Sequence, residues 1–347
     1  LIAGLSYEIL RLLAKSDAKI LYIFKWPGLL LQRLTTKEPT DDMIECAIAA
    51  FRTVEAMDAD ENIPEKMFPI GGKLTEILKH TKERFAQAQI DTKKVKIGDF
   101  TQKVTKIVLT GNAIYDGVLQ DEVAARWRIS PYEFCTLEEF NSLKNSDKYY
   151  FLITTKGQFK KEAEPSLQFL TLVKGGNKAS NGIDEMLEIV SMPIASAEDP
   201  SGRELVFLPV FITVIQNYTL DSMDRDYNAY LGLTNYSSKL SKADGKEIVF
   251  SEDDLDATVD KEACTGFTVT DEDEADDYII KNTPNTLVSY VAAPTNPGAG
   301  SYCYKMLIDS QTYELYYYRK HRINAKSGAG FLPGDIKHIN TTRSGLK

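Results

Sequence analysis

Residues 128–155 combine two different patterns of apolar positions. Leu137, Phe140 and Leu143 recur every third residue, which predicts a short amphipathic helix. Residues 149–153 form a continuous apolar run rich in aromatic and branched side chains, which predicts a strand buried on both faces. The stretch therefore predicts strand, helix and strand in succession, and the rest of the fold is predicted around it.

The central helix of this stretch has a start signal in the sequence. Thr136 followed by Glu139 predicts a capping box, in which each side chain pairs a backbone N–H that the helix leaves unsatisfied. A strand is predicted upstream at 106–110, followed by a helix whose apolar residues lie four apart: Leu119, Val123 and Trp127. This alternation predicts an α/β fold, with α+β as the alternative: a mixed sheet with flanking helices, preceded by a mostly helical N-terminal segment.

Further strands are predicted downstream at 167–173, 246–250 and 286–292. Residues 186–192 predict a passage from helix to strand, and residues 203–220 mix strand and helix signals, with Pro209 at a helix start. Residues 302–308 and 313–319 predict a hairpin. Strand alternation within it places Tyr313, Leu315 and Tyr317 on one face and Tyr316 and Tyr318 on the other.

Changes in composition divide the chain into five parts. We expect a helical segment at 1–56, a linker at 57–72, an amphipathic helix at 73–91, an α/β domain at 95–340 and a disordered tail at 341–347. The linker is acidic and holds two prolines and a double glycine. The most apolar segment, 20–31, falls short of the roughly 20 residues that span a bilayer, so we expect an interfacial or core helix there.

Charge and cysteine usage narrow the partners. The net charge of −9 argues against nucleic acid, because phosphate binding needs a basic face. The four cysteines show no CxxC spacing and no zinc-site spacing with histidine, so free thiols are expected. In an oxidising compartment, a structural disulfide would be the alternative. The chain begins at Leu1, which suggests a fragment or a processed protein, and no signal peptide is visible.

The densest acidic cluster lies at 271–277. As a metal site it would use Asp271, Asp273 and Asp276, but the glycine and the final glutamate of a calcium-binding loop are missing. The alternative is a solvated first helical turn, which acidic residues favour through the helix dipole. We favour the second interpretation and expect no metal and no cofactor.

A run of aromatic and basic residues at 316–322 is the candidate binding surface. Its members are Tyr316, Tyr318, Arg319 and His321. A surface on which single-stranded nucleic acid or a glycan stacks is one interpretation, and a core strand with an exposed edge is the other. The chain has three histidines, no nucleophile elbow and no complete phosphate-binding loop, so the sequence favours a protein that is not an enzyme and leaves the question open.

Two N-terminal stretches resemble known families. AGLSYEILRL and PGLLLQRLTTKEPTDDMIECAIAAF, at 3–12 and 27–51, resemble the C-terminal end of the YqhQ-like family of bacterial membrane proteins, which are often described as metal-dependent enzymes. The membrane helices and histidines of that family are absent, so the resemblance implies no metal site here and only a membrane-proximal location. KLTEILKHTKERFAQAQI, at 73–90, resembles the first helix of release factor glutamine methyltransferases, without their cofactor loop.

Residues 95–340 resemble a family of secreted proteins from gut anaerobes. The resemblance rests on WRISPYEF at 127–134, KGGN at 174–177, MPI at 192–194, NTPNT at 282–286 and YCYKM at 302–306. It implies a compact α/β domain that is normally exported, and it implies no activity. Since this chain shows no signal peptide, its localisation stays open.

Three functional hypotheses follow. The favoured one is a non-enzymatic binding or structural α/β module with a protein or glycan ligand. The alternative is an enzyme remnant, either a metal-dependent hydrolase or a truncated methyltransferase. The third is a chimeric sequence with no single function, with its break near 90–96, which predicts that residues 1–90 pack weakly on the rest.

Overall fold

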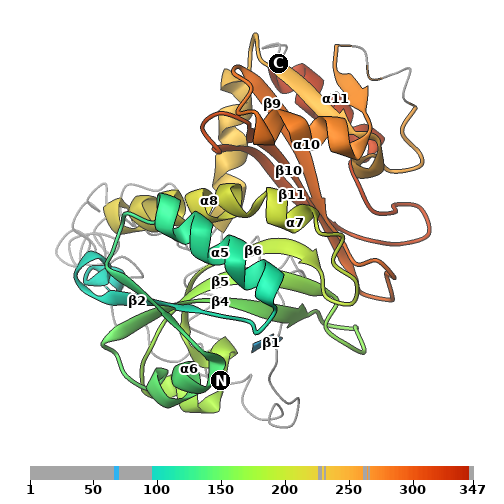
Figure 1. The fold of residues 1–347 in the computed structure, drawn as a ribbon. Coiled ribbons are helices and arrows are strands. Elements are labelled where there is room, and N and C mark those ends of the chain that lie inside the picture. Colours follow the sequence, from blue (N-terminus) through green and yellow to red (C-terminus); the bar gives the residue numbers. More distant parts are fainter. Residues whose placement is uncertain are drawn as a thin grey trace, which may run out of the picture. The chain divides into compact units, whose positions relative to one another are not determined.

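The computed structural model describes residues 66–69, 96–225, 229, 232–260, 264 and 266–343, and only the backbone of 66–69. The chain divides into two compact units, 1–51 and 52–347, and all described residues belong to the second. The predicted helices at 1–56 and 73–91 and most of the predicted linker therefore lie outside the described residues. In the second unit the predicted α/β class is confirmed, with two mixed sheets against which helices pack (Figure 1).

The first sheet has the strand order β3-β2-β4-β5-β6, with β1 beside β4. Its strands are β1 (Lys66–Pro69), β2 (Val104–Val108), β3 (Tyr132–Cys135), β4 (Tyr149–Gln158), β5 (Leu167–Lys174) and β6 (Leu187–Ser196). β2 runs parallel to β3 and β4, whereas β1, β5 and β6 pair antiparallel. β1 comes from the segment that was predicted to pack weakly, and it pairs with β4 over four residues.

The helices of this half lie before, between and after these strands along the chain. They are η2 (Phe100–Gln102), α5 (Ala113–Arg126), α6 (Leu137–Leu143), η3 (Asn177–Asn181), η4 (Ile183–Glu185), α7 (Arg203–Val206) and α8 (Leu208–Asp224). No helix in the described part of the chain has the length and apolar character needed to cross a bilayer.

The second sheet has the strand order β11-β10-β9-β7-β8. Its strands are β7 (Glu247–Ser251), β8 (Thr268–Thr270), β9 (Thr286–Ala292), β10 (Tyr302–Asp309) and β11 (Leu315–Arg322). The helices of this half are η5 (Gly232–Lys242), η6 (Glu252–Asp254), α10 (Glu272–Ile280) and α11 (Pro333–Arg343). Residues 341–343, predicted as part of a disordered tail, instead continue α11 because its helical hydrogen bonds extend to Arg343.

The two sheets repeat one topology. With β1 left aside, the first strand of each sheet along the chain (β2 or β7) lies between the second and the third, parallel to both, and the fourth and fifth strands extend the sheet antiparallel. The register also repeats: the corresponding pairs are Val104–Tyr149 and Lys106–Glu133 in the first sheet, and Glu247–Thr286 and Val249–Thr268 in the second. Tyr132 and Phe134 of β3 therefore correspond to Phe267 and Val269 at β8.

The helix after the second strand begins in the same way in both halves. Thr136 caps α6 and completes the predicted capping box with Glu139, whose carboxylate accepts the Thr136 N–H. Asp271 caps α10 and accepts the N–H of Glu274, which holds the position of Glu139. Because side-chain caps satisfy orphan backbone donors, both helices start sharply after their strands.

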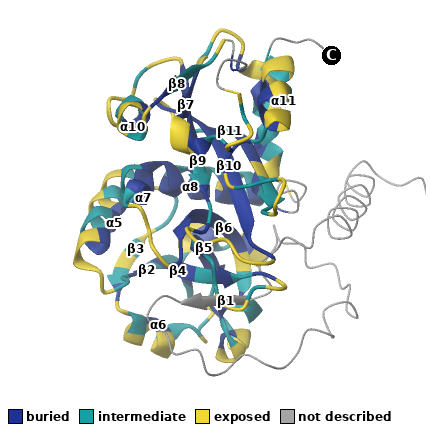
Figure 2. Cartoon of the chain, turned by 90° about the vertical axis from the view of Figure 1, so that its right-hand side faces the viewer, coloured by how far each residue is buried: buried dark blue, intermediate teal, exposed yellow. Residues whose placement is uncertain are grey.

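A shared apolar core joins the two sheets. The central strands of each are buried, while α6, α10 and α11 carry exposed outer faces (Figure 2). One cluster contains side chains of both sheets, and the ring of Phe159 lies 4.7 Å from that of Tyr302. A second cluster lies between the second sheet and α11. The two halves therefore share one apolar core.

Residues 203–220 form two helices, α7 and α8, separated by a turn at Phe207, which corrects the mixed prediction. The strand signal came from branched residues such as Val210, Ile212 and Ile215, which are typical of strands. In α8 these side chains are buried, because the helix has apolar neighbours on most of its surface. Pro209 lies in the first turn of α8, where its missing N–H costs no hydrogen bond.

A bulge in β11 corrects the predicted alternation of the hairpin. Tyr317 lies opposite Leu307 and Leu315 lies opposite Ile308, so Tyr316 is an extra residue in the ladder. Tyr316 and Tyr317 consequently pack on the cluster beneath α11, whereas Leu315 and Tyr318 pack on the shared core. An inserted residue shifts the alternation by one position, and residue spacing alone did not reveal it.

Candidate functional site

The predicted binding residues of β11 do not form one surface. Tyr318 is buried, its ring lies 5.8 Å from that of Tyr304, and the hydroxyl of Ser237 in η5 bonds both its N–H and its carbonyl. Tyr316 is half-buried, with the Lys246 ammonium 5.5 Å from its ring centroid. η5 thus occupies the outer edge of β11 near Tyr318.

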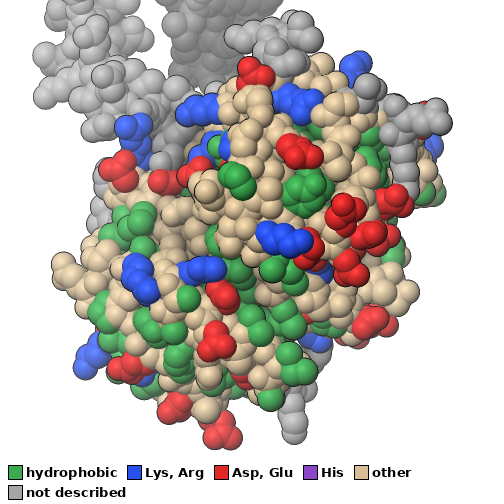
Figure 3. All heavy atoms as spheres, turned by 45° about the horizontal axis from the view of Figure 1, so that its top comes forward, with side chains coloured by type: hydrophobic (Ala, Val, Ile, Leu, Met, Phe, Trp, Pro, Cys, Tyr) green, Lys and Arg blue, Asp and Glu red, His purple; other side chains and the backbone are tan. Residues whose placement is uncertain are grey.

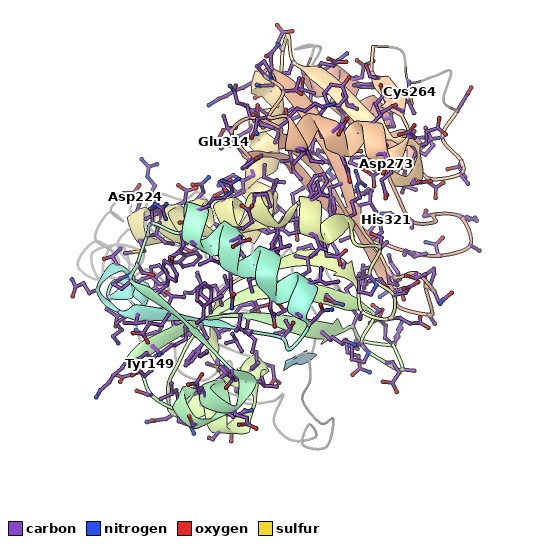
Figure 4. All side chains as sticks on the ribbon, in the orientation of Figure 1. Tyr149, Asp224, Cys264, Asp273, Glu314 and His321 are labelled. Carbon is purple, nitrogen blue, oxygen red and sulfur yellow. The ribbon has the colours of Figure 1, made fainter. Side chains whose placement is uncertain are left out.

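Arg319 and His321 lie on the opposite face of the strand from Tyr318. Arg319 is exposed and its guanidinium lies 3.4 Å from His338 Nε2. His321 Nε2 lies 2.7 Å from the carbonyl oxygen of Gly328, which fixes the proton on Nε2 as its donor (Figure 4). Burial and the nearby Lys305 lower the pKa of His321, so the imidazole is held neutral.

Cys303 lies directly opposite His321 in the sheet, which raises the question of a thiol–imidazole pair. The thiol is fully buried and accepts the Gly330 N–H at 3.2 Å. Burial raises the pKa of the Cys303 thiol to about 12. A thiol held protonated is a poor nucleophile, so this pair does not provide an activated cysteine. Cys135 and Cys264 are also free and buried, and Cys46 lies outside the described residues.

The three acidic candidates serve three different purposes. Asp271 caps α10, Asp273 is exposed in its first turn, and Asp276 is buried against Arg203. Acidic side chains gather on the face of the molecule seen in Figure 3. Burial raises the pKa of Glu272 against the attraction of Arg203, and the charges of Asp254, Asp253 and Asp273 act in the same direction as burial. Among the described residues, no group of three or more His, Cys, Asp or Glu side chains is placed to hold a metal ion.

Arg203 links α7 to the second sheet through a buried network. Its Nε donates to Asp276 at 2.8 Å, one terminal nitrogen donates to Asp254 at 2.9 Å, and the other donates to the carbonyl of Ser289 at 3.1 Å. Asp254 also accepts the Ser289 hydroxyl at 2.5 Å. Burial of a charged pair is tolerated when its hydrogen bonds are satisfied, so this network is a structural link between the halves.

β3 differs from these buried groups because it ends the first sheet. The carbonyls of Pro131 and Cys135 accept the N–H groups of Thr105 and Leu109, at 2.8 and 2.9 Å. Since odd-numbered residues of β3 therefore bond to β2, the N–H and C=O groups of Tyr132 and Phe134 point toward the free edge. Among the described residues no strand pairs with that edge.

A groove lies at the start of this strand. It has a volume of about 1000 Å³ and is lined by Thr101, Trp127, Arg128, Ile129, Ser130, Pro131, Tyr132 and Leu220. Leu220 of α8 is 44% exposed, although it is a large apolar side chain. Tyr132 and Phe134 are half-buried, and their rings lie 5.7 Å apart on one face of the sheet. The groove is therefore continuous with an aromatic edge.

Local bonds set the shape of the groove. The Arg128 guanidinium donates to the carbonyls of Ala124, Ala125 and Trp127, and so closes the C-terminus of α5. The Arg128 N–H donates to Gln216 of α8 at 2.8 Å, which ties this helix to the start of β3. Trp127 is buried and donates its indole N–H to Ser130 at 3.0 Å.

The residues of this groove entered the sequence analysis, but the groove itself was not predicted. Residues 127–134 were part of the family resemblance, and residues 128–155 were used to predict the fold. A run of four strand residues predicts the strand, whereas its position at the end of a sheet depends on pairing that only the topology shows.

Comparison with known proteins assigns only the N-terminal part of the chain. Residues 1–57 match a family described as "Protein of unknown function (DUF1385)". The chain is 42% identical over 59 residues to the uncharacterized protein YqhQ of Bacillus subtilis (strain 168), which is 17% of this chain and 19% of YqhQ. The chain thus spans about a fifth of that relative. No solved structure matches the chain.

Proposed function

We propose that the α/β part of this chain is a non-enzymatic binding module that takes an extended peptide along the edge of β3. The observation that supports it is the edge of β3, which no strand of the described residues pairs with, and where the backbone groups of Tyr132 and Phe134 are directed outward beside the groove. A peptide strand added to such an edge obtains main-chain hydrogen bonds from the strand and side-chain contacts from adjacent pockets.

The size of the site favours a short peptide. Eight residues line the groove, whereas stable interfaces between folded proteins use about 20–30 residues on each side. β3 itself is four residues long and offers outward backbone groups at two of them. A segment of about four to six residues in extended conformation would fill the edge and reach the groove.

This proposal moves the binding surface from the one expected in β11. The β11 edge is bonded to η5 at Tyr318, while β3 has no such cover among the described residues. Two resemblances remain proposals. They are that of residues 95–340 to an exported family and that of residues 73–90 to a methyltransferase helix. Membrane proximity of the N-terminal segment is likewise a proposal, which rests on the resemblance of residues 1–56 to YqhQ-like membrane proteins.

The test removes a single outward donor. A heptapeptide library displayed on phage is selected on the full chain, and the affinity of the enriched peptides is measured by calorimetry. Phe134→Pro removes the outward N–H and keeps the bonds to β2, so we expect at least a tenfold loss of affinity, since one main-chain hydrogen bond and the strand geometry are lost. Phe134→Ala, which keeps the N–H, is the matched control.

A second arm does not depend on the fold of the variant. N-methylation of the selected peptide at alternate residues should abolish binding in one parity only, because only every second N–H faces β3. Equal affinities of wild type and Phe134→Pro, or equal tolerance of N-methylation at both parities, would contradict strand addition. Thermal unfolding of both variants shows whether they remain folded.

A further inference from the structure

The second sheet contains a closed counterpart of the β3 edge. Phe267, at the start of β8, holds the position of Tyr132, and its ring packs against Phe250 at 5.4 Å. The Arg343 guanidinium lies 4.6 Å from the Phe267 ring centroid and donates to the Gly266 carbonyl at 2.8 Å. At this edge the chain's own arginine therefore covers the aromatic ring and bonds the preceding carbonyl.

At the same place in the first sheet, no cation of the described residues lies over the ring of Tyr132, which lines the groove. Arg128 is also in the lining, but its guanidinium is engaged by three carbonyls at the end of α5. Tyr132, which corresponds to Phe267, thus has no covering arginine among the residues that the structure describes.

We propose that the groove beside β3 accepts an arginine side chain of the bound peptide, with its guanidinium over the Tyr132 ring. The inference rests on the proposed function and specifies its ligand. A planar guanidinium can stack on an aromatic face and donate to a carbonyl at the same time, as Arg343 does with Phe267 and Gly266 in the second sheet.

The overall charge of the chain agrees with a basic ligand. The chain carries a net charge of −9, which attracts a cationic peptide at long range. An acidic or wholly apolar peptide would lack this advantage.

The test compares two peptides that differ in one charge. Fluorescein-labelled Thr-Val-Arg-Val-Thr and its counterpart with citrulline in place of arginine are titrated with the full chain, and fluorescence anisotropy is recorded. Citrulline keeps the shape of arginine and lacks its charge. We expect the arginine peptide to bind about tenfold more tightly, the size of a partly desolvated cation–π contact. Tyr132→Leu should remove this difference, and Tyr132→Phe should retain most of it.

The outcomes separate this inference from the proposed function. If both peptides bind equally and Phe134→Pro abolishes both, strand addition stands and the arginine site is overturned. Failure of both peptides to bind also overturns the arginine site. If the arginine peptide binds Phe134→Pro as well as wild type, charge attraction alone explains it and strand addition is overturned. If the arginine peptide binds more tightly, and this preference is lost both in Tyr132→Leu and in Phe134→Pro, the result supports the arginine site and strand addition.

Discussion

Arg203 is surrounded by more negative charge than it can balance. Asp254 and Asp276 lie 2.9 and 2.8 Å from its guanidinium, and Glu272 lies 3.9 Å away. Burial raises the pKa of Asp276 to about 6, against the attraction of Arg203 and in the same direction as Glu272 and Asp254. One site therefore holds a carboxyl group that takes up a proton in mildly acidic solution.

The first prediction concerns the effect of pH on stability through Asp276. Its folded-state pKa lies above the usual 3.8, so its contribution to the free energy of unfolding is complete below about pH 4 and is lost as pH rises through about 6. The shift amounts to roughly 3 kcal/mol. We expect Asp276→Asn to flatten the dependence of the unfolding free energy on pH between 4 and 6, measured by urea unfolding.

The exposed neighbour Asp277 provides the control for this prediction. It pairs with Lys281 on the same helix, and Asp277→Asn should leave the pH dependence unchanged. Identical pH profiles for Asp276→Asn and wild type would show that the raised pKa is not linked to folding. At lower pH, hydrogen bonds from Lys103, Tyr150 and Lys174 overcome burial and lower the pKa of Asp99 to about 2, so its contribution is lost only in strong acid.

The second prediction concerns the thiols. Burial raises the pKa of Cys135 to about 11 and that of Cys303 to about 12. In a Cys46→Ser variant we expect the native protein at pH 8 to show no fast-reacting thiol with Ellman's reagent, because reaction needs an accessible thiolate. All three thiols should react in urea. A thiol that reacts within seconds in the native protein would contradict the burial described here.

At the scale of elements, the loop before α11 depends on one glycine. Gly330 has a φ of +101°, and a Cβ there would lie 2.7 Å from the Asp254 carbonyl oxygen. The close approach lets Phe331 donate to Asp254 O and accept from Asp256 N, so the loop is tied to the residues that follow β7. A side chain at this position would force the two segments apart.

The third prediction follows from this contact. Gly330→Ala should lower the free energy of unfolding by roughly 2–4 kcal/mol, because it combines a strained φ with a backbone clash. Gly334→Ala is the matched control: it lies in α11, no atom lies within 4 Å of its Cβ position, and we expect a change within about 1 kcal/mol, toward higher stability. Equal effects of the two substitutions, measured by urea unfolding, would refute the proposed strain.

Elements with a local signal were predictable from the sequence, and those set by distant partners were not. Thr136 and Glu139 form the predicted capping box because its partners are three residues apart. The strand at 286–292 and the two strands of the hairpin were also predicted, because their signal is an apolar run within the strand itself. The bulge at Tyr316, the helix at 208–224 and the open edge of β3 depend on neighbours far along the chain.

At the scale of the whole second unit, the repeated topology was not visible in the sequence. The two halves share strand order, register and helix caps, while their side chains differ at corresponding places, such as Tyr132 and Phe267. The sequence predicted one mixed sheet, because the boundary between the sheets lies within a continuous series of strands and helices. Positions that only need a buried side chain accept different apolar residues of suitable size. Two halves with the same backbone topology can therefore have different sequences.

The fourth prediction is that both halves unfold together. The shared core contains aromatic rings from both sheets, such as Phe159 and Tyr302, and Arg203 links them by hydrogen bonds. In a Trp26→Phe variant, urea unfolding followed by Trp127 fluorescence in the first half should coincide with exposure of the Cys303 thiol in the second. Midpoints that differ by more than the measurement error would show that the halves are separate cooperative units.

The open edge of β3 also exposes the protein to aggregation, since an unpaired strand can template any other extended chain. One feature of the strand opposes this. Glu133, which pairs with Lys106, lies at its centre. In an antiparallel stack of two copies centred on the strand, the two Glu133 side chains would lie opposite each other and repel. Glu133 thus opposes self-association of the protein, because a second copy would bring a second carboxylate next to it. The same residue permits binding of a peptide that has no acidic side chain at that position.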